Sequence, residues 1–189
     1  MWFRGFCAAF LITAGLSLPA SAYETDVLFE HKNWKVDIHG WDDGEIGCRA
    51  IVGSDRESFS IWIFQNGSIQ LQFFSTSWAF GAEQFADLQL QIDKRERWDL
   101  TNARLSQNSV EFNLPDNDAA VNFVMEIAQG SKLYLRAKDG KDVQNYSLAG
   151  SRASIDKLLE CGNAISGSSG TGTGTGTGSA SPAPSNPFK

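Results

Sequence analysis

The stretch WIFQNGSIQLQF, residues Trp62–Phe73, has the pattern of a β-hairpin, and its register decides which side chains of the domain share a face. Asn66-Gly67 favours a two-residue type I′ turn, because both central residues of that turn need positive φ. We therefore expect Gln65 to face Ser68, which fixes the register along both strands. The predicted pairs on the core face are Phe64 with Ile69, Trp62 with Leu71, and Ser60 with Phe73.

The second face of this hairpin is half apolar and half amide, and two interpretations of it stay open. A helix from later in the chain can cover it and make it core. Left uncovered, it is an apolar patch of the kind that often marks an interaction site. The candidate partner-binding residues are Phe59, Ile61, Ile63 and Phe74 on this face, together with Trp41 and Trp78.

Apolar and polar residues alternate in most of the remaining stretches, which indicates further β-strands. The period is broken near Thr101-Asn102, where a bulge would bring both halves of one strand into phase. These patterns predict a mainly β fold, an antiparallel β-sandwich or a strongly curved sheet of about eight strands with two short helices. The stretches that alternate are residues 33–41, 48–53, 87–93, 97–105, 109–114, 132–137 and 143–148.

Two stretches change to helical spacing. In residues 116–130 we expect Asp116 or Asp118 to cap the start and Gly130 to close the end. This helix is the predicted cover for the second hairpin face. In residues 150–162, Ser151 is the expected N-cap and Gly162 the expected end.

The two ends of the chain differ in composition from its body. Residues 1–22, MWFRGFCAAFLITAGLSLPASA, have the pattern of a secretory signal peptide, with an apolar run too short for a comfortable membrane span. Residues 163–189 are rich in Gly, Thr, Ser and Pro, which predicts a flexible tail. We expect a single β-rich domain over residues 23–162, periplasmic or secreted, with no transmembrane segment in the mature chain.

Two cysteines remain after removal of the signal peptide, Cys48 and Cys161. In an oxidising compartment an even number of cysteines favours a disulfide bond. A zinc site with His31 and His39 would need ligands at closer spacing, and a catalytic thiol would leave the second cysteine unexplained. The sequence therefore predicts a disulfide, with neither metal nor cofactor.

Charge and motif content limit the function. The net charge of −6 argues against nucleic acid and anionic membranes as partners, since both attract basic surfaces. His39 with nearby carboxylates is the densest candidate for general acid–base chemistry, but DDGE at residues 42–45 is more typical of a solvated turn. Phosphate-loop and nucleophile-elbow motifs are absent, so we expect no enzymatic activity.

The C-terminal stretch of the body resembles a known family. YSLAGSRASIDKLL, residues Tyr146–Leu159, lies within a region of about forty residues that resembles the end of exported bacterial proteins of the invasion-associated locus B type. There, a helix, a Gly turn, a strand, a second Gly-bearing turn, a strand ending in hydrophobic-Ser-Leu-x-Gly and a final helix follow in that order. The resemblance implies a periplasmic or secreted β-rich protein without a cofactor.

Three functions are compatible with these features. The first is a non-catalytic, envelope-associated exported protein that binds a macromolecular partner, either a protein or a component of the cell envelope. The second is an inhibitor or immunity protein against an exported hydrolase, in which the acidic turn at residues 42–45 would block a basic cleft of the hydrolase. The third is a small enzyme, which would need a cleft that holds His39 and two carboxylates.

Overall fold

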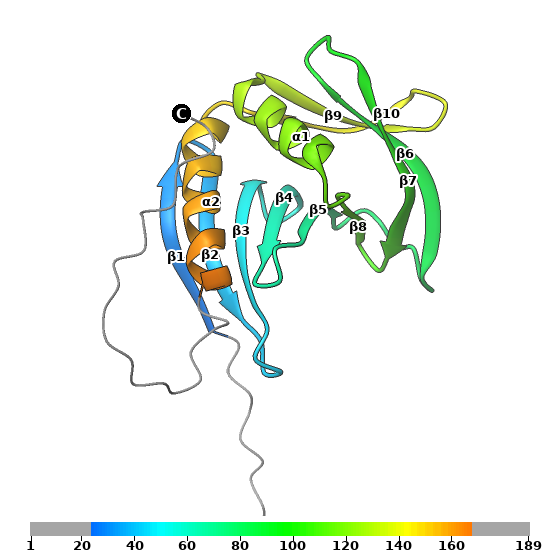
Figure 1. The fold of residues 1–189 in the computed structure, drawn as a ribbon. Helices are drawn as coiled ribbons and strands as arrows, with labels where there is room; N and C mark the ends of the chain where they lie inside the picture. Colours follow the sequence, from blue (N-terminus) through cyan, green and yellow to red (C-terminus); the bar gives the residue numbers. More distant parts are fainter. Residues whose placement is uncertain (1–23, 168–189) are drawn as a thin grey trace, which may run out of the picture.

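The computed structural model describes residues 24–167, which form a single antiparallel sheet of ten strands and two helices (Figure 1). The predicted signal peptide and most of the predicted tail lie outside the described residues. The elements are β1 (Glu24–His31), β2 (Trp34–Gly40), β3 (Ile46–Gly53), β4 (Glu57–Phe64), β5 (Ile69–Ser75), β6 (Gln84–Ile92), β7 (Arg97–Ser106), β8 (Ser109–Asn113), α1 (Asp118–Gln129), β9 (Lys132–Ala137), β10 (Asp142–Ser147) and α2 (Ser151–Gly167).

Strands β4 and β5 form the expected hairpin, but the predicted register is wrong by one residue. The Phe64 N–H donates to the Ser68 carbonyl at 3.0 Å, and the Gly67 N–H donates to the Phe64 carbonyl at 2.8 Å. Gly67 has φ of 83°, so the loop has three residues, a type I turn followed by a left-handed glycine. The observed pairs are Ile63 with Ile69, Ile61 with Leu71, Phe59 with Phe73, and Ser58 with Phe74.

This shift of one residue exchanges the two faces of β4, because successive side chains of a strand point to opposite sides. Phe59 and Ile61 are completely buried and Ile63 is 8% exposed. The predicted partner-binding face is therefore core, and that prediction is wrong for these three residues. Phe74 does not share their face, since it lies half-buried on the opposite side of the sheet.

The helix that covers β4 is α2 and not α1. Helix α2 runs along β1 to β4 on the side of the core (Figure 1). It approaches so closely that a Cβ atom at Gly162 would lie 2.8 Å from Cγ2 of Ile63. The expected cover by α1 is wrong, and so is the expected helix end at Gly162, because α2 continues to Gly167.

The other local predictions hold in part. Asn117 caps α1 instead of Asp116 or Asp118, and its side chain accepts from the Ala119 N–H, while Gly130 ends the helix as expected. Ser151 starts α2, but its hydroxyl donates to the Ile127 carbonyl of α1 at 2.8 Å and so joins the two helices. The bulge near Asn102 is confirmed by a φ of 60° and a register shift in β6–β7.

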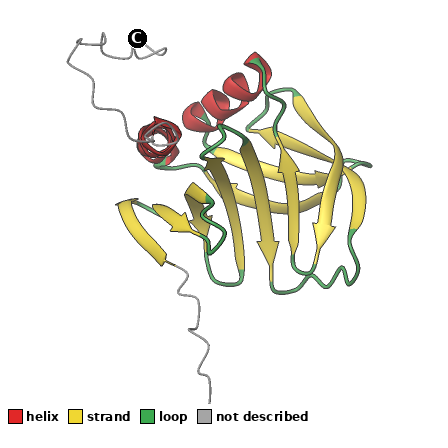
Figure 2. Cartoon of the chain, turned by 60° about the horizontal axis from the view of Figure 1, so that its bottom comes forward, coloured by secondary structure: helices red, strands yellow, loops and turns green. Residues whose placement is uncertain are grey.

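The ten strands follow the order β1-β2-β3-β4-β5-β8-β7-β6-β9-β10 in one continuous sheet that does not close. The sheet curls strongly (Figure 2), and two side-chain hydrogen bonds bring β10 against β4 and β5 across the core. The Tyr146 hydroxyl of β10 donates to the Ser58 carbonyl at 3.0 Å, and the Gln144 amide reaches the Phe74 carbonyl at 3.4 Å. The strongly curved sheet is thus the observed alternative, with ten strands where about eight were expected; β1 is the strand that has no counterpart among the predicted stretches.

The predicted disulfide between Cys48 of β3 and Cys161 of α2 is present, with the two Cα atoms 6.0 Å apart. It ties α2 to the inner face of the sheet, the face that encloses the core. Within residues 24–167, no helix combines the length and the apolar character that crossing a bilayer requires.

Candidate partner-binding surface on the outer face of the sheet

Three aromatic rings gather on the outer face of the sheet, the face turned away from the core. The ring of Trp62 lies 5.7 Å from that of Trp41 and 5.9 Å from that of Phe64, and Trp41 and Phe64 are 6.1 Å apart. Trp62 is 7% exposed, while Trp41 and Phe64 are half-buried. We call Trp41, Trp62 and Phe64 the outer aromatic patch.

A glycine in β3 allows these rings to lie flat on the strand. A Cβ atom at Gly47 would lie 3.1 Å from the Trp41 ring and 3.2 Å from the Phe64 ring. Those contacts are closer than ordinary van der Waals separations, so any larger residue would displace the rings. The patch therefore depends on its backbone as much as on its side chains.

A buried ion network lies beside the patch. The carboxylate of Asp37 is completely buried, and Arg49 binds both of its oxygens, each at 2.9 Å. His39 Nε2 lies 2.7 Å from Oδ1 of Asp37, and the Lys35 ammonium lies 3.0 Å from Oδ2. The Arg49 guanidinium also lies 5.0 Å from the centre of the Trp62 ring, within the range of a cation–π contact. Asp37 thus fixes the cation that supports the central ring of the patch.

Burial alone would raise the pKa of Asp37. The hydrogen bonds from His39 and Arg49 and the positive charge of Arg49 outweigh burial and hold this pKa well below its ordinary value. The folded state therefore favours the carboxylate, and Asp37 contributes stability above the pKa that it has in the unfolded chain, about 3.9. This contribution is lost as the pH falls below that value toward the lower pKa of the folded state.

We expect Asp37→Asn to lower the free energy of unfolding at pH 7 by about 2–4 kcal/mol, because it leaves the partly buried Arg49 without its counter-ion. At pH 3 the difference from the wild type should be smaller by about 1 kcal/mol, since the wild-type protein has then lost part of the Asp37 contribution. Urea unfolding of both proteins at the two pH values measures this.

The matched control is Asp55→Asn, at an exposed carboxylate in the turn between β3 and β4. It should change stability by less than about 0.5 kcal/mol at either pH. An Asp37→Asn effect of the same size at pH 3 and pH 7 would contradict the lowered pKa.

An acidic turn borders the patch. Asp42, Asp43 and Glu45 are exposed between β2 and β3. Two backbone hydrogen bonds hold the turn, from Trp41 N–H to the Glu45 carbonyl and from Gly44 N–H to the Trp41 carbonyl, both at 2.9 Å. The turn therefore presents negative charge in a fixed position next to the Trp41 ring.

The remaining sequence-predicted site residue lies elsewhere. Trp78 belongs to the segment between β5 and β6, where its ring lies 5.5 Å from that of Phe80. Both side chains are partly buried against the core, as expected for that segment. The structure thus does not bring Trp78 together with Trp41, and it has no place in the outer aromatic patch.

His39 is on the outer face, as its alternation with Lys35 predicts, but neighbouring side chains cover it to 3% exposure. Its Nδ1 lies 3.1 Å from the Thr25 hydroxyl and its Nε2 contacts Asp37. Both ring nitrogens therefore contact protein groups, and one of these groups is the Asp37 carboxylate. Over residues 24–167, no three His, Cys, Asp or Glu side chains form a group that could hold a metal ion. The expected lack of enzymatic activity stays a prediction.

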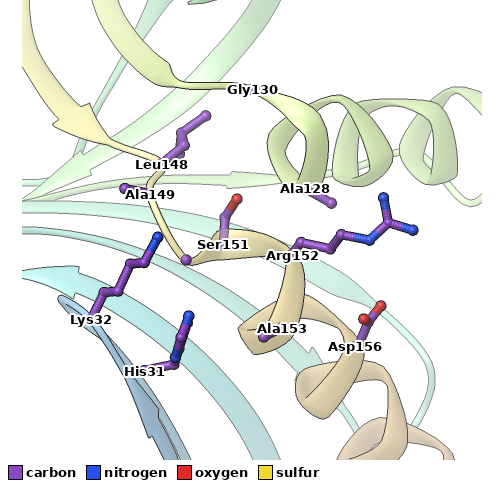
Figure 3. Close-up of a pocket in the computed structure, with 11 residues that line it drawn as sticks. His31, Lys32, Ala128, Gly130, Leu148, Ala149, Ser151, Arg152, Ala153 and Asp156 are labelled. Atoms are coloured by element: carbon purple, nitrogen blue, oxygen red, sulfur yellow. The ribbon is translucent and has the colours of Figure 1, made fainter.

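A hollow of about 420 Å³ lies where α2 begins (Figure 3). His31 and Lys32 border it from the end of β1, and Arg152 and Asp156 border it from α2. The Ser151 hydroxyl is not available there, because it donates to the Ile127 carbonyl. This hollow contains none of the predicted partner-binding residues.

Sequence reasoning missed Trp62, Phe64 and the ion network. The two aromatic residues were assigned to the core by the wrong hairpin register. The proximity of Asp37 and His39 was predicted, since residues two apart in a strand share a face, but their ion network was not. The contact of Asp37 with Arg49 depends on the pairing of these two residues between β2 and β3, and the sequence of the turn at residues 40–47 does not reveal that pairing.

Comparisons with known proteins give the chain a likeness in fold. No protein-family model matches it, and no curated protein matches its sequence. Among solved structures, it is similar to the crystal structure of invasion associated protein B from Bartonella henselae, with 15% identity, a TM-score of 0.48, and coverage of 76% of this chain and 99% of that chain. This neighbour has the name of the family that residues 146–159 resemble. At this level of identity the likeness assigns no residue role and no activity, and membership of the family stays a prediction.

Proposed function

We propose that the chain is an exported, non-catalytic protein that binds a protein partner through the outer aromatic patch. The observation that carries the proposal is the fixed cluster of Trp41, Trp62 and Phe64 on the outer face. Tryptophan is strongly enriched among the residues that dominate binding energy at protein interfaces, and such residues are supported by well-packed neighbours. Here Arg49 and Gly47 supply that support.

Export is supported by the disulfide. Cross-links of this kind persist in oxidising compartments and are rare in the cytosol, and this one joins the two cysteines that follow the predicted signal peptide. The predicted location, periplasmic or secreted, follows from these two features together.

The charge around the patch indicates what its partner presents. The acidic turn, with Asp42, Asp43 and Glu45, lies on one side, and the whole chain has a net charge of −6. Charges across an interface are arranged in complementary fashion and steer the encounter. The partner should therefore have an apolar contact area bordered by lysine or arginine, and its association should slow as the salt concentration rises.

The test is photo-cross-linking in the source cells with a benzophenone amino acid at position 41. A single partner protein should be captured from position 41 and not from position 143, where Val143 is 43% exposed on the opposite edge strand β10. Capture from both positions, or from neither, would contradict the proposal.

Once the partner is purified, Trp41→Ala with Phe64→Ala should weaken its binding by at least about tenfold, equivalent to about 1.4 kcal/mol. Val143→Ala is the matched control and should bind as the wild type does. Thermal unfolding of each variant shows whether the loss comes from binding or from the fold. Wild-type affinity in the double variant would overturn the assignment to the patch.

A second candidate function, inhibition of a basic exported hydrolase, is favoured by the fixed acidic turn. Such an inhibitor would place Asp42 and Asp43 in a positively charged substrate cleft. Lysozyme is a suitable basic probe. Inhibition by the wild type and its loss in Asp42→Asn with Asp43→Asn would favour this function, and full lysozyme activity in the presence of the wild type would count against it.

A further inference from the structure

A small polar cleft of about 260 Å³ lies on the outer face, over the strands that follow β5 in the sheet. Phe85 lines it and is 61% exposed. The pairing of Phe85 with Arg104 places this ring on the outer face of the sheet. Phe85 lies on β6, four strands beyond β4 in the order of the sheet, whereas Gln70, which also lines the cleft, pairs with Trp62, so the cleft adjoins the outer aromatic patch and extends away from it.

The cleft offers both hydrogen-bond donors and acceptors. Gln70 donates to the side-chain oxygen of Asn113 at 3.0 Å. Within the described residues, this leaves the Gln70 oxygen as an acceptor and the Asn113 amide nitrogen as a donor, each aligned by the bond between them. The side chains of Thr101 and Asn102, at the bulge of β7, also line the cleft and make no hydrogen bond within the described part of the chain.

The cation that lines the cleft, Arg104, is paired with carboxylates. Arg104 donates to Glu83 at 3.1 Å and also to Glu111. The hydrogen bond to Glu111, followed by that to Glu83, raises the pKa of Arg104, so Arg104 stays cationic. A cation held by two carboxylates does not attract an anion, which makes the cleft unsuited to a phosphate or a carboxylate.

We propose that this cleft binds an uncharged oligosaccharide, with one pyranose ring stacked on Phe85. Sugar hydroxyls donate and accept together, as the groups of Gln70, Asn113 and Thr101 require. The C–H face of a pyranose is apolar and covers an exposed aromatic ring, which is otherwise left in water. A peptide is a poorer match for this amide-rich lining, since peptide recognition commonly uses a row of apolar pockets, and Phe85 is the one exposed large apolar side chain among the described residues that line the cleft.

The test uses four tetrasaccharides as probes: chitotetraose, cellotetraose, maltotetraose and the acidic tetragalacturonate. Each is titrated to millimolar concentration into the ¹⁵N-labelled domain, and backbone and side-chain amide signals are followed by NMR. At least one neutral probe should bind and shift the signals of Asn102 and of the Asn113 side chain. Phe85→Ala should weaken that binding by at least about tenfold, whereas Val143→Ala, also at an exposed apolar residue, should leave it unchanged.

Each other result overturns the proposal. One such result is that no neutral probe binds, and another is that the signal shifts lie outside the cleft. The others are wild-type affinity in Phe85→Ala and tighter binding of tetragalacturonate than of the neutral probes. The Trp41→Ala variant separates this site from the proposed function. It should lose the protein partner and keep the saccharide, so either site can fail without the other.

Discussion

Replacement of Ile61 by aspartate should abolish folding or lower the free energy of unfolding by more than about 4 kcal/mol. Ile61 is completely buried on the inner face of β4, opposite Leu71. A carboxylate there would lose its hydration without gaining a partner, and the apolar contacts of the isoleucine would also be lost. Urea unfolding followed by circular dichroism measures the effect.

The matched control is Ile51→Asp, one strand away on the outer face. Ile51 pairs with Lys35 across β2 and β3 and is half-buried, so a carboxylate there faces a cation. Its cost should be no more than about 1 kcal/mol. The two variants distinguish the two hairpin registers, because a type I′ turn at Asn66-Gly67 would place Ile61 on the outer face. A folded Ile61→Asp protein with near wild-type stability would overturn the observed register.

The register of the hairpin shows where local sequence rules reach their limit. Asn-Gly is compatible with two loops of different length, since both need a residue with positive φ at the glycine. The choice between them is made by tertiary contacts. The Gln65 N–H donates to the Ile46 carbonyl at 3.1 Å, and the three-residue loop places Phe59, Ile61 and Ile63 in the core, with Ile63 against Gly162 of α2. None of these contacts is local in sequence.

Features that follow from composition, or from the alternation of apolar and polar residues, were predictable. Features that depend on contacts between residues far apart in the sequence were not. The mainly β fold, the positions of two helices, the bulge near Asn102 and the disulfide follow from local patterns. Gly162 is the opposite case: by local rules it ends α2, but it lies inside the helix because Ile63 leaves no room for a side chain. The outer aromatic patch was not predicted for the same reason, since Trp62 contacts Arg49 only after β3 and β4 pair.

Removal of the disulfide should also lower the free energy of unfolding by a large amount. In the chain-entropy model, a cross-link that spans 113 residues stabilises the folded state by about 4–5 kcal/mol, because it restricts the unfolded chain. The double variant Cys48→Ala with Cys161→Ala should therefore lose about that much free energy of unfolding. Replacing both cysteines avoids a reactive single thiol, and guanidinium unfolding of variant and wild type gives the difference.

Reduced wild-type protein is the control, since it keeps both sulfur atoms in the core and lacks only the bond. Cys48 is completely buried and Cys161 is 6% exposed, so the alanine variant also loses packing and should be slightly less stable than the reduced protein. Because α2 covers the inner face of β4, loss of the bond should also speed amide exchange in α2 more than in β6 or β9. Thiols that react with a maleimide in the native, unreduced protein, or a stability loss below about 1 kcal/mol, would show that the bond does not hold α2 in place.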